Sequence, residues 1–200
     1  MNSLQADLPD HLKDNPYFAF SEDTNFVPAW DKIRPEHALP AMDYIFERMR
    51  KDIEAIATNP KVPTFKNTSE ALERAFALPM YFFLTFFTAM PRNEADLKKN
   101  DDIQKVISDK FHDAYMDAFL DQRLYERFLV LTLLIDETKV PTEKEKLFGM
   151  YGATFKVCGI SKPLAEQKKI REMGKKISAI SRISQTNMRE AEKHTFVHVT

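Results

Sequence analysis

The strongest constraint on the fold is the spacing of apolar residues, which recur at intervals of three and four positions along most of the chain. That repeat places side chains on one face of an α-helix. The clearest run has apolar residues at Ile103, Val106, Ile107, Phe111, Ala114, Tyr115 and Ala118. The alternation typical of a strand is found only at residues 195–200. The sequence therefore predicts an all-α fold, with residues 195–200 as a candidate short C-terminal strand.

Prolines indicate where these helices begin and end. The chain has 11 prolines and 4 glycines, and proline is tolerated in the first turn of a helix but disrupts its interior. One helix is expected to start within 35–40 and to run to Thr58, before Asn59-Pro60. Residues 1–34 have no sustained period and are expected to form an irregular N-terminal arm over a helical domain at 35–200. We expect about six long helices, packed as a bundle.

Capping residues locate further helix ends. Two places match the capping box, in which a Ser, Thr, Asp or Asn and an acidic residue three positions later satisfy backbone N–H groups of the first turn. Glycine commonly follows the last turn of a helix. Helix starts are predicted at Asn67 with Glu70, at Asp121, at Thr142 with Glu145 and at Ser161, and a helix end is predicted at Gly159.

Three segments are expected to pack into the core. The stretch 75–90 is apolar on nearly all sides, but its 16 residues fall short of the about 20 that span a membrane, so we expect a helix buried within the bundle. The first helix is expected to face the core with Met42, Ile45, Met49, Ile53 and Ile56. The last helix is expected to face it with Ile170, Met173, Ile177 and Ile180.

Charge and cysteine usage exclude several classes of protein. The 29 Lys and Arg residues balance 30 Asp and Glu residues, so the net charge of -1 gives no attraction to nucleic acid or to an anionic membrane. Residues 162–193 hold nine basic residues against four Glu, but no aromatic residues for base stacking, which favours a solvated face over nucleic-acid binding. The single Cys158 cannot form an internal disulfide and is expected to be buried. With no secretory signal at the first residues, we expect a cytoplasmic location.

No catalytic or metal-binding residue is predicted. The closest match to His-Glu-x-x-His is His194 to His198, where threonine occupies the position of the glutamate. In a strand, residues four apart are separated by about 13 Å, too far to share one zinc ion. His11 and His112 are isolated, and His37 is expected to form a local hydrogen bond. The chain alone is therefore interpreted as non-catalytic.

An aromatic stretch at residues 81–87 has two interpretations. Its members are Tyr81, Phe82, Phe83, Phe86 and Phe87. As core residues they are ordinary, and as the wall of a peptide channel they would give apolar contacts to extended substrates. We favour the core.

Several motifs together resemble the start of M3 family zinc metallopeptidases, the thimet-oligopeptidase-like enzymes that include oligopeptidase A and bacterial dipeptidyl carboxypeptidase. The resemblance is densest over 15–73 and departs at Trp30, where this subfamily usually has phenylalanine. Residues 91–139 match only in helical character. The motifs are Asn15-Pro16-Tyr17-Phe18, Pro28 to His37, Pro40-Ala41, Ile53 to Pro60, Pro63 to Thr68 and Ala71 to Glu73.

This resemblance implies the N-terminal helical lobe of a larger peptidase that hydrolyses short peptides. Its helices would form the wall of the substrate channel opposite the zinc site, and its partners would be its own C-terminal catalytic domain and short peptides. The zinc site would lie in that catalytic domain, which these 200 residues lack, so the chain alone is expected to be inactive. Substrate-contacting residues stay unassigned, and both internal cleavage and removal of C-terminal dipeptides stay open.

A second hypothesis is a stand-alone, non-catalytic helical module that binds peptides or proteins. The two hypotheses differ in the size of the natural polypeptide. A lone strand at 195–200 would leave its backbone groups unpaired, so we expect the polypeptide to continue past Thr200.

Overall fold

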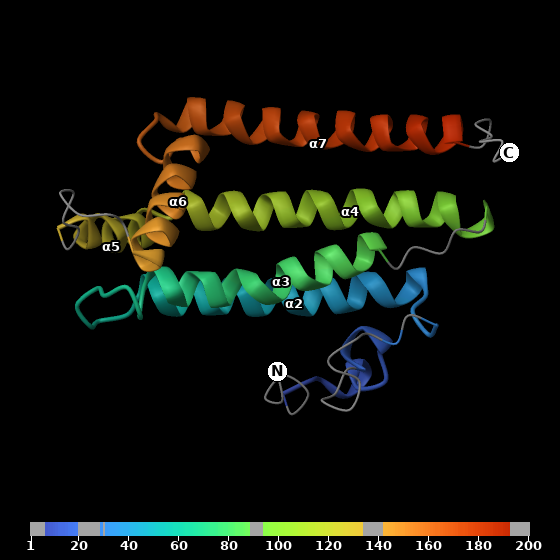
Figure 1. Cartoon of the computed structure of the whole chain (residues 1–200), viewed down its shortest axis with the longest axis horizontal. Coiled ribbons are helices and arrows are strands. Elements are labelled where there is room, and N and C mark those ends of the chain that lie inside the picture. The colour runs from blue at the N-terminus through green and yellow to red at the C-terminus, as the bar shows by residue number, and fades with distance from the viewer. Residues whose placement is uncertain (1–6, 20–28, 30, 89–93, 134–141, 193–200) are drawn as a thin grey trace, which may run out of the picture.

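The computed structural model describes residues 7–19, 29, 31–88, 94–133 and 142–192. This part of the chain contains six α-helices and no strand, which confirms the all-α prediction (Figure 1). The candidate strand at 195–200 lies outside it. The helices are α2 (Pro35–Ala57), α3 (Ser69–Thr88), α4 (Glu94–Phe119), α5 (Gln122–Thr132), α6 (Glu143–Cys158) and α7 (Leu164–Glu192).

The three longest helices lie side by side, with α4 between α2 and α7 (Figure 1). Helix α3 packs along α2, while α5 and α6 gather at one end of the layer. The apolar stripe predicted for the first helix, from Met42 to Ile56, is buried at all five positions. Among the described helices, none is long and apolar enough to cross a membrane.

The N-terminal arm is held against α2 and α3 by aromatic contacts. It contains two short 3-10 turns, Asp10–Leu12 and Pro16–Phe18. The ring of Phe18 lies 5.1 Å from that of Phe82 in α3 and 5.8 Å from that of Tyr44 in α2. The Asn15 side chain donates a hydrogen bond to the backbone carbonyl of His37, in the first turn of α2, at 2.9 Å. Residues 7–19 of this segment therefore contribute buried side chains to the core, among them Leu12, Tyr17 and Phe18.

An aromatic cluster joins α3, α4, α5 and α6. Phe119 is fully buried at its centre. Its ring centroid lies 4.6 to 5.9 Å from the rings of Phe76, Tyr115, Tyr151 and Phe155. Such ring pairs add to the free energy of burial, so the cluster helps to hold these helices together.

Three of the predicted helix ends are confirmed. The Asp121 carboxylate accepts hydrogen bonds from the first backbone N–H groups of α5. Thr142 and Glu145 form the expected capping box at α6. Gly159 ends α6 with φ of 84°, a left-handed conformation that glycine adopts without strain.

Two predicted helix starts are misplaced: the cap predicted at Asn67 is one residue early, and the start predicted at Ser161 is three residues early. Helix α3 begins at Ser69, and Asn67 stabilises the preceding loop through hydrogen bonds to the Thr64 N–H and the Val62 carbonyl. Helix α7 begins at Leu164, after Pro163, and not at Ser161. At α3 the hydrogen bonds of Asn67 within the loop compete with its role as a cap. At α7 the proline before the helix favours a later start.

Two predictions of burial are also wrong. Helix α3 is exposed on one side, where the Met80 and Leu84 side chains are 42% and 58% exposed. On α7, only Ile170 packs against the core, while Met173, Ile177 and Ile180 are 53%, 65% and 66% exposed. The 3.6-residue period identifies an apolar side of a helix, but it does not say which neighbour covers that side.

Candidate functional site

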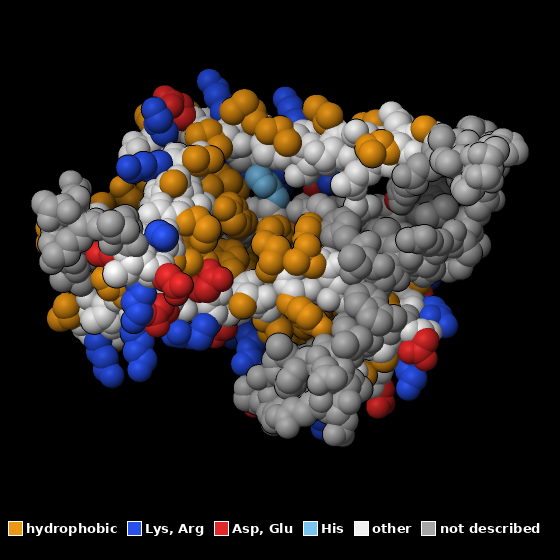
Figure 2. All heavy atoms as spheres, viewed as in Figure 1, with side chains coloured by type: hydrophobic (Ala, Val, Ile, Leu, Met, Phe, Trp, Pro, Cys, Tyr) orange, Lys and Arg blue, Asp and Glu red, His pale blue; other side chains and the backbone are white. Residues whose placement is uncertain are grey.

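A groove runs along α4 between α3 on one side and α6 and α7 on the other. It consists of two adjoining hollows, of about 520 and 350 Å³, which share Tyr115. Figure 2 shows hydrophobic side chains gathered around this hollow surface. We call it the α4 groove. The larger hollow is lined by Phe83, Leu84, Gln104, Ser108, Phe111, His112, Tyr115, Ile177, Ser178, Ser181, Arg182 and Gln185.

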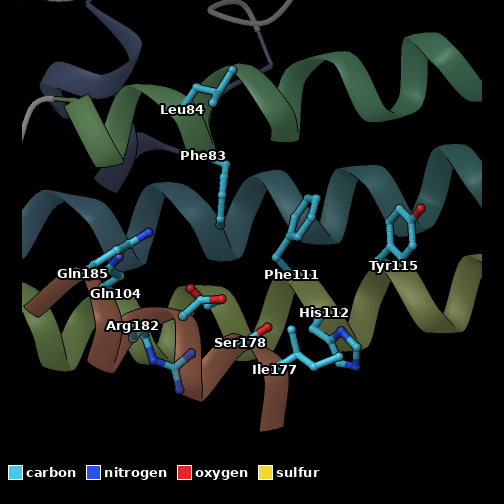
Figure 3. Close-up of a pocket in the computed structure, with 12 residues that line it drawn as sticks. Phe83, Leu84, Gln104, Phe111, His112, Tyr115, Ile177, Ser178, Arg182 and Gln185 are labelled. Carbon is cyan, nitrogen blue, oxygen red and sulfur yellow. Dashed lines mark hydrogen bonds between the residues drawn. The ribbon is translucent and has the colours of Figure 1, made fainter. Parts of the chain in front are cut away.

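Aromatic rings form the apolar part of the groove. The rings of Phe83 and Phe111 stack at 5.0 Å, and that of Tyr115 lies 6.2 Å from Phe111 (Figure 3). Burial raises the pKa of Tyr115, so its hydroxyl is a neutral hydrogen-bonding group at physiological pH. The smaller hollow continues between Met80 of α3 and Met150 of α6.

Polar side chains from α4 and α7 line the opposite edge. Gln104 donates a hydrogen bond to Gln185 across the two helices at 3.4 Å. The Arg182 guanidinium is 3.8 Å from the Asp109 carboxylate, and its Nη1 is buried without a hydrogen-bond acceptor among the described atoms. Figure 3 shows Gln104, Arg182 and Gln185 together at one end of the larger hollow. A groove with an apolar floor and amide and guanidinium groups at its edge suits an extended peptide segment.

Ion pairs between α4 and α7 hold the groove together. Lys175 and Arg171 both contact Asp113, at 2.8 and 3.4 Å, and Arg171 also contacts Asp117 at 2.6 Å. Burial alone would raise the pKa of Asp113, but its hydrogen bond to Lys175 and the two positive charges lower that pKa overall. The Asp113 carboxylate is therefore charged at physiological pH, and the pairs link the two helices.

The His112 side chain of α4 lies directly against Gly174 of α7, which adds to the contact between the two helices. A Cβ at residue 174 would lie 2.2 Å from Cε1 of His112, so only glycine fits without a shift of the imidazole. His112 Nε2 lies 3.0 Å from the Arg171 carbonyl oxygen. Since a carbonyl only accepts, Nε2 carries the proton and donates. His112 is thus a contact residue between α4 and α7.

The structure places the other residues considered in the sequence away from any common site. His37 accepts a hydrogen bond from the Arg34 backbone N–H at 3.0 Å, which confirms the predicted local role. Cys158 is buried, as predicted. His194 and His198 lie outside the described residues. Over the ranges that the structure describes, no three His, Cys, Asp or Glu residues are grouped so that they could hold a metal ion.

The aromatic stretch of α3 divides between the core and the groove. Phe82 and Phe86 are buried in the core, while Phe83 lines the groove. Sequence reasoning missed Arg171, Lys175 and Arg182 as groove-forming residues. The signal was present, because Asp109, Asp113 and Asp117 recur every four positions on α4 and so form an acidic row on one face.

Two curated proteins are similar to the chain over most of its length. It is 25% identical over 178 residues to the dipeptidyl carboxypeptidase of Escherichia coli (strain K12), which is 88% of this chain and 25% of that protein. It is 27% identical over 166 residues to the dipeptidyl carboxypeptidase of Salmonella typhimurium, covering 82% of this chain and 23% of that protein. No family model matches the chain.

These matches agree with the motif run of the N-terminal third, which resembles the same kind of enzyme. The chain spans about a quarter of the length of the curated relatives it matches. Most of this chain is therefore distantly similar to one part of the bacterial dipeptidyl carboxypeptidases. Those enzymes are M3 peptidases.

Proposed function

We propose that this chain is the helical lobe of a zinc-dependent oligopeptidase that hydrolyses short peptides. In this proposal, residues 1–34 and 35–200 form the arm and the helical domain of the lobe, and the α4 groove is part of the channel wall opposite the zinc site. The observation that carries the proposal is the similarity to dipeptidyl carboxypeptidases over 88% and 82% of the chain. The groove supports it, because it offers an apolar floor to a peptide.

The hydrolytic chemistry is assigned to another part of the peptidase. His-Glu-x-x-His is absent from the sequence, and the described His, Cys, Asp and Glu residues form no metal-binding group. These residues do not fit a catalytic zinc, so no catalytic step is assigned to them. Zinc belongs, in this proposal, to the catalytic domain of the presumed parent.

The role left to this chain is to bind and orient the peptide. Phe83, Phe111 and Tyr115 present flat apolar surfaces to peptide side chains. Gln104 and Gln185 carry amide groups that match the donors and acceptors of a peptide backbone. Facing walls also exclude water from the bound peptide, which strengthens its polar contacts.

A stand-alone binding module is the second candidate. It is favoured by the groove itself, because the lining residues come from this chain alone and need no catalytic domain to bind a peptide. The two candidates differ in the mass of the native protein and in whether it carries zinc.

One experiment separates them. An antibody raised against residues 1–200 is used to purify the native protein from source cells, followed by measurement of its mass, its zinc content and its cleavage of an internally quenched short peptide. We expect a mass several times 23.3 kDa, bound zinc and chelator-sensitive cleavage. A protein of 23.3 kDa that retains peptides without cleaving them would replace the first proposal with the second.

A further inference from the structure

The smaller hollow of the α4 groove contains a single carboxylate, that of Glu73 on α3. Among the described residues that line this hollow, none is basic. Three aromatic rings and two methionine side chains surround the carboxylate, and they belong to Phe76, Tyr115, Tyr151, Met80 and Met150. The hollow thus combines one negative group with apolar and aromatic walls.

The Glu73 carboxylate is held in place by Tyr151 of α6. Because a carboxylate only accepts, the Tyr151 hydroxyl donates its proton to Oε2 of Glu73. Burial raises the pKa of Tyr151, and the neighbouring Glu73 raises it further, so the phenol keeps that proton at physiological pH. A carboxylate offers about four acceptor positions, so one phenol leaves most of them for a second donor.

The cations near this end of α3 are engaged with other groups. Glu70, three residues before Glu73, is paired with Lys144 of α6 at 3.1 Å. Arg74 donates a hydrogen bond to a backbone carbonyl of the preceding loop at 3.2 Å. The position four residues after Glu73, where a basic side chain would form an ion pair within the helix, is Ala77. Glu73 therefore gives this hollow a net negative charge.

The aromatic walls add to the attraction of the hollow for a cation. Aromatic rings attract a cation that lies within about 6 Å of the ring centroid, and methionine sulfur makes polarisable contacts. Phe76 and Tyr151 are only 7% and 6% exposed, so a group that enters the hollow leaves water on that side. Attraction to a carboxylate is stronger there than in bulk water. The volume of about 350 Å³ suits an alkylammonium group rather than a whole peptide.

We propose that the smaller hollow is a cation subsite of the α4 groove, in which Glu73 and the surrounding rings bind the ammonium group of a lysine side chain or of a peptide N-terminus. The inference rests on the proposed function, because it takes the groove as a binding place for peptides and adds a preference among them. The larger hollow carries the guanidinium of Arg182, which disfavours a cation there. The two hollows therefore differ in the charge that they accept.

The test measures peptide binding by the native protein purified from source cells. Stopped-flow fluorescence anisotropy records binding before any cleavage. The probes are short alanine-based peptides with a fluorophore at the C-terminus: an acetylated peptide with a lysine scanned through its positions, the same peptide with norleucine, and the norleucine peptide with a free N-terminus. We expect a lysine or a free N-terminus to tighten binding about tenfold over acetylated norleucine. The peptide that gains identifies the source of the ammonium group.

Three variants tie that preference to the subsite. Glu73→Gln removes the charge but keeps an amide oxygen that accepts from Tyr151, so it should abolish the preference and leave binding of acetylated norleucine unchanged. Ala77→Lys places an ammonium group four residues after Glu73 and should abolish the preference by filling the subsite. Glu126→Gln, the matched control, removes an exposed carboxylate of α5 outside the groove and should retain the preference.

Equal binding of all the peptides, or a preference for the cation that survives Glu73→Gln, would overturn the inference. If urea unfolding shows that Glu73→Gln disrupts the fold, Ala77→Lys decides the same question with Glu73 intact. Zinc content and cleavage by the same preparation are measured in parallel. A zinc peptidase without the Glu73-dependent preference keeps the proposed function and loses the subsite. A protein that shows the preference without zinc or cleavage keeps the subsite and loses the peptidase.

Discussion

The imidazole of His112 lies so close to Gly174 that a Cβ at residue 174 would be 2.2 Å from its Cε1 atom. The two helices therefore approach closely at this point, beside the α4 groove, which His112 also lines.

We expect Gly174→Ala to destabilise the chain by about 1 kcal/mol, because overpacking by about 1–3 kcal/mol exceeds the helix propensity gained. In a His112→Ala background the same change is expected to stabilise by up to about 1 kcal/mol, since the clash is gone. Urea unfolding measures both. Gly152→Ala is the matched control, because nothing lies within 4 Å of a Cβ there, and it should stabilise in either background. Equal effects of Gly174→Ala in the two backgrounds would exclude the contact.

The Asp113 pairs predict a pH dependence of the α4–α7 contact. The pKa of Asp113 is lower in the folded chain, so its stabilisation is present above the unfolded pKa of about 3.9 and is lost as pH falls through the folded pKa. Because Asp113 is partly exposed, we expect Asp113→Asn to cost only about 0.5–1 kcal/mol at pH 7 and to remove part of the acid sensitivity. Hydrogen exchange of the α7 backbone amides at pH 7 and pH 3 measures how stably α7 stays packed on α4 at each pH. Asp102→Asn, an exposed change on the same helix, should leave α7 unaffected.

The Cys158 thiol is expected to react only when the chain unfolds. Burial raises its pKa to about 11, whereas an unfolded cysteine has a pKa of about 8.5. At pH 8 a disulfide reagent should therefore modify it at the rate of unfolding, and modification should follow the urea transition. The control is Val157→Cys in a Cys158→Ser background, because residue 157 is 77% exposed and should react at once. Rapid reaction of Cys158 in the folded chain would contradict its burial.

Leu84 provides a test of the groove in the native peptidase. Its side chain is 58% exposed at the groove edge, so Leu84→Asp should leave folding intact. Loss of apolar contact of about 1.4 kcal/mol is expected to lower kcat/KM for short peptides about tenfold. Val62→Asp, at a 76% exposed site between α2 and α3, should have no effect. Unchanged kcat/KM in the Leu84 variant would remove the groove from the substrate path.

The exposed apolar side chains of α7 predict how the 200-residue chain behaves alone; they are Met173, Ile177, Ile180, Ile183 and Met188. With these side chains exposed, the chain should associate weakly as its concentration rises, without reaching a fixed stoichiometry. The Ile177→Lys/Ile180→Lys variant should sediment as a monomer with little change in unfolding free energy, because both side chains are about two thirds exposed. Val157→Lys, on α6, should associate like the original chain. A stable dimer in the double variant would contradict this assignment.

The parts of the fold that depend on local interactions could be predicted from the sequence. The Asp121 cap and the Thr142–Glu145 capping box involve residues within three positions of each other, and both form as expected. The stripe of the first helix was also predictable, since α2 has neighbours in α3 and α4.

The orientation of α7 was not predictable by the same reasoning. Its apolar period suggested that Met173, Ile177 and Ile180 are buried, but Arg171 and Lys175 face α4 in ion pairs with Asp113 and Asp117, and the three apolar side chains are more than half exposed. The groove was likewise not predictable, because Phe83 and Gln185 are 102 residues apart in the sequence and line the same hollow only through the packing of three helices. Periodicity reports the chemistry of a helix side, whereas its neighbours depend on long-range packing.

The aromatic contacts of the N-terminal arm impose an order on biosynthesis. Phe18 packs on Tyr44 and Phe82, so its binding place does not exist until α2 and α3 have been translated and have left the ribosome. The segment around Phe18 is synthesised first, and it stays unburied until about sixty further residues have been translated and it can pack on α2 and α3.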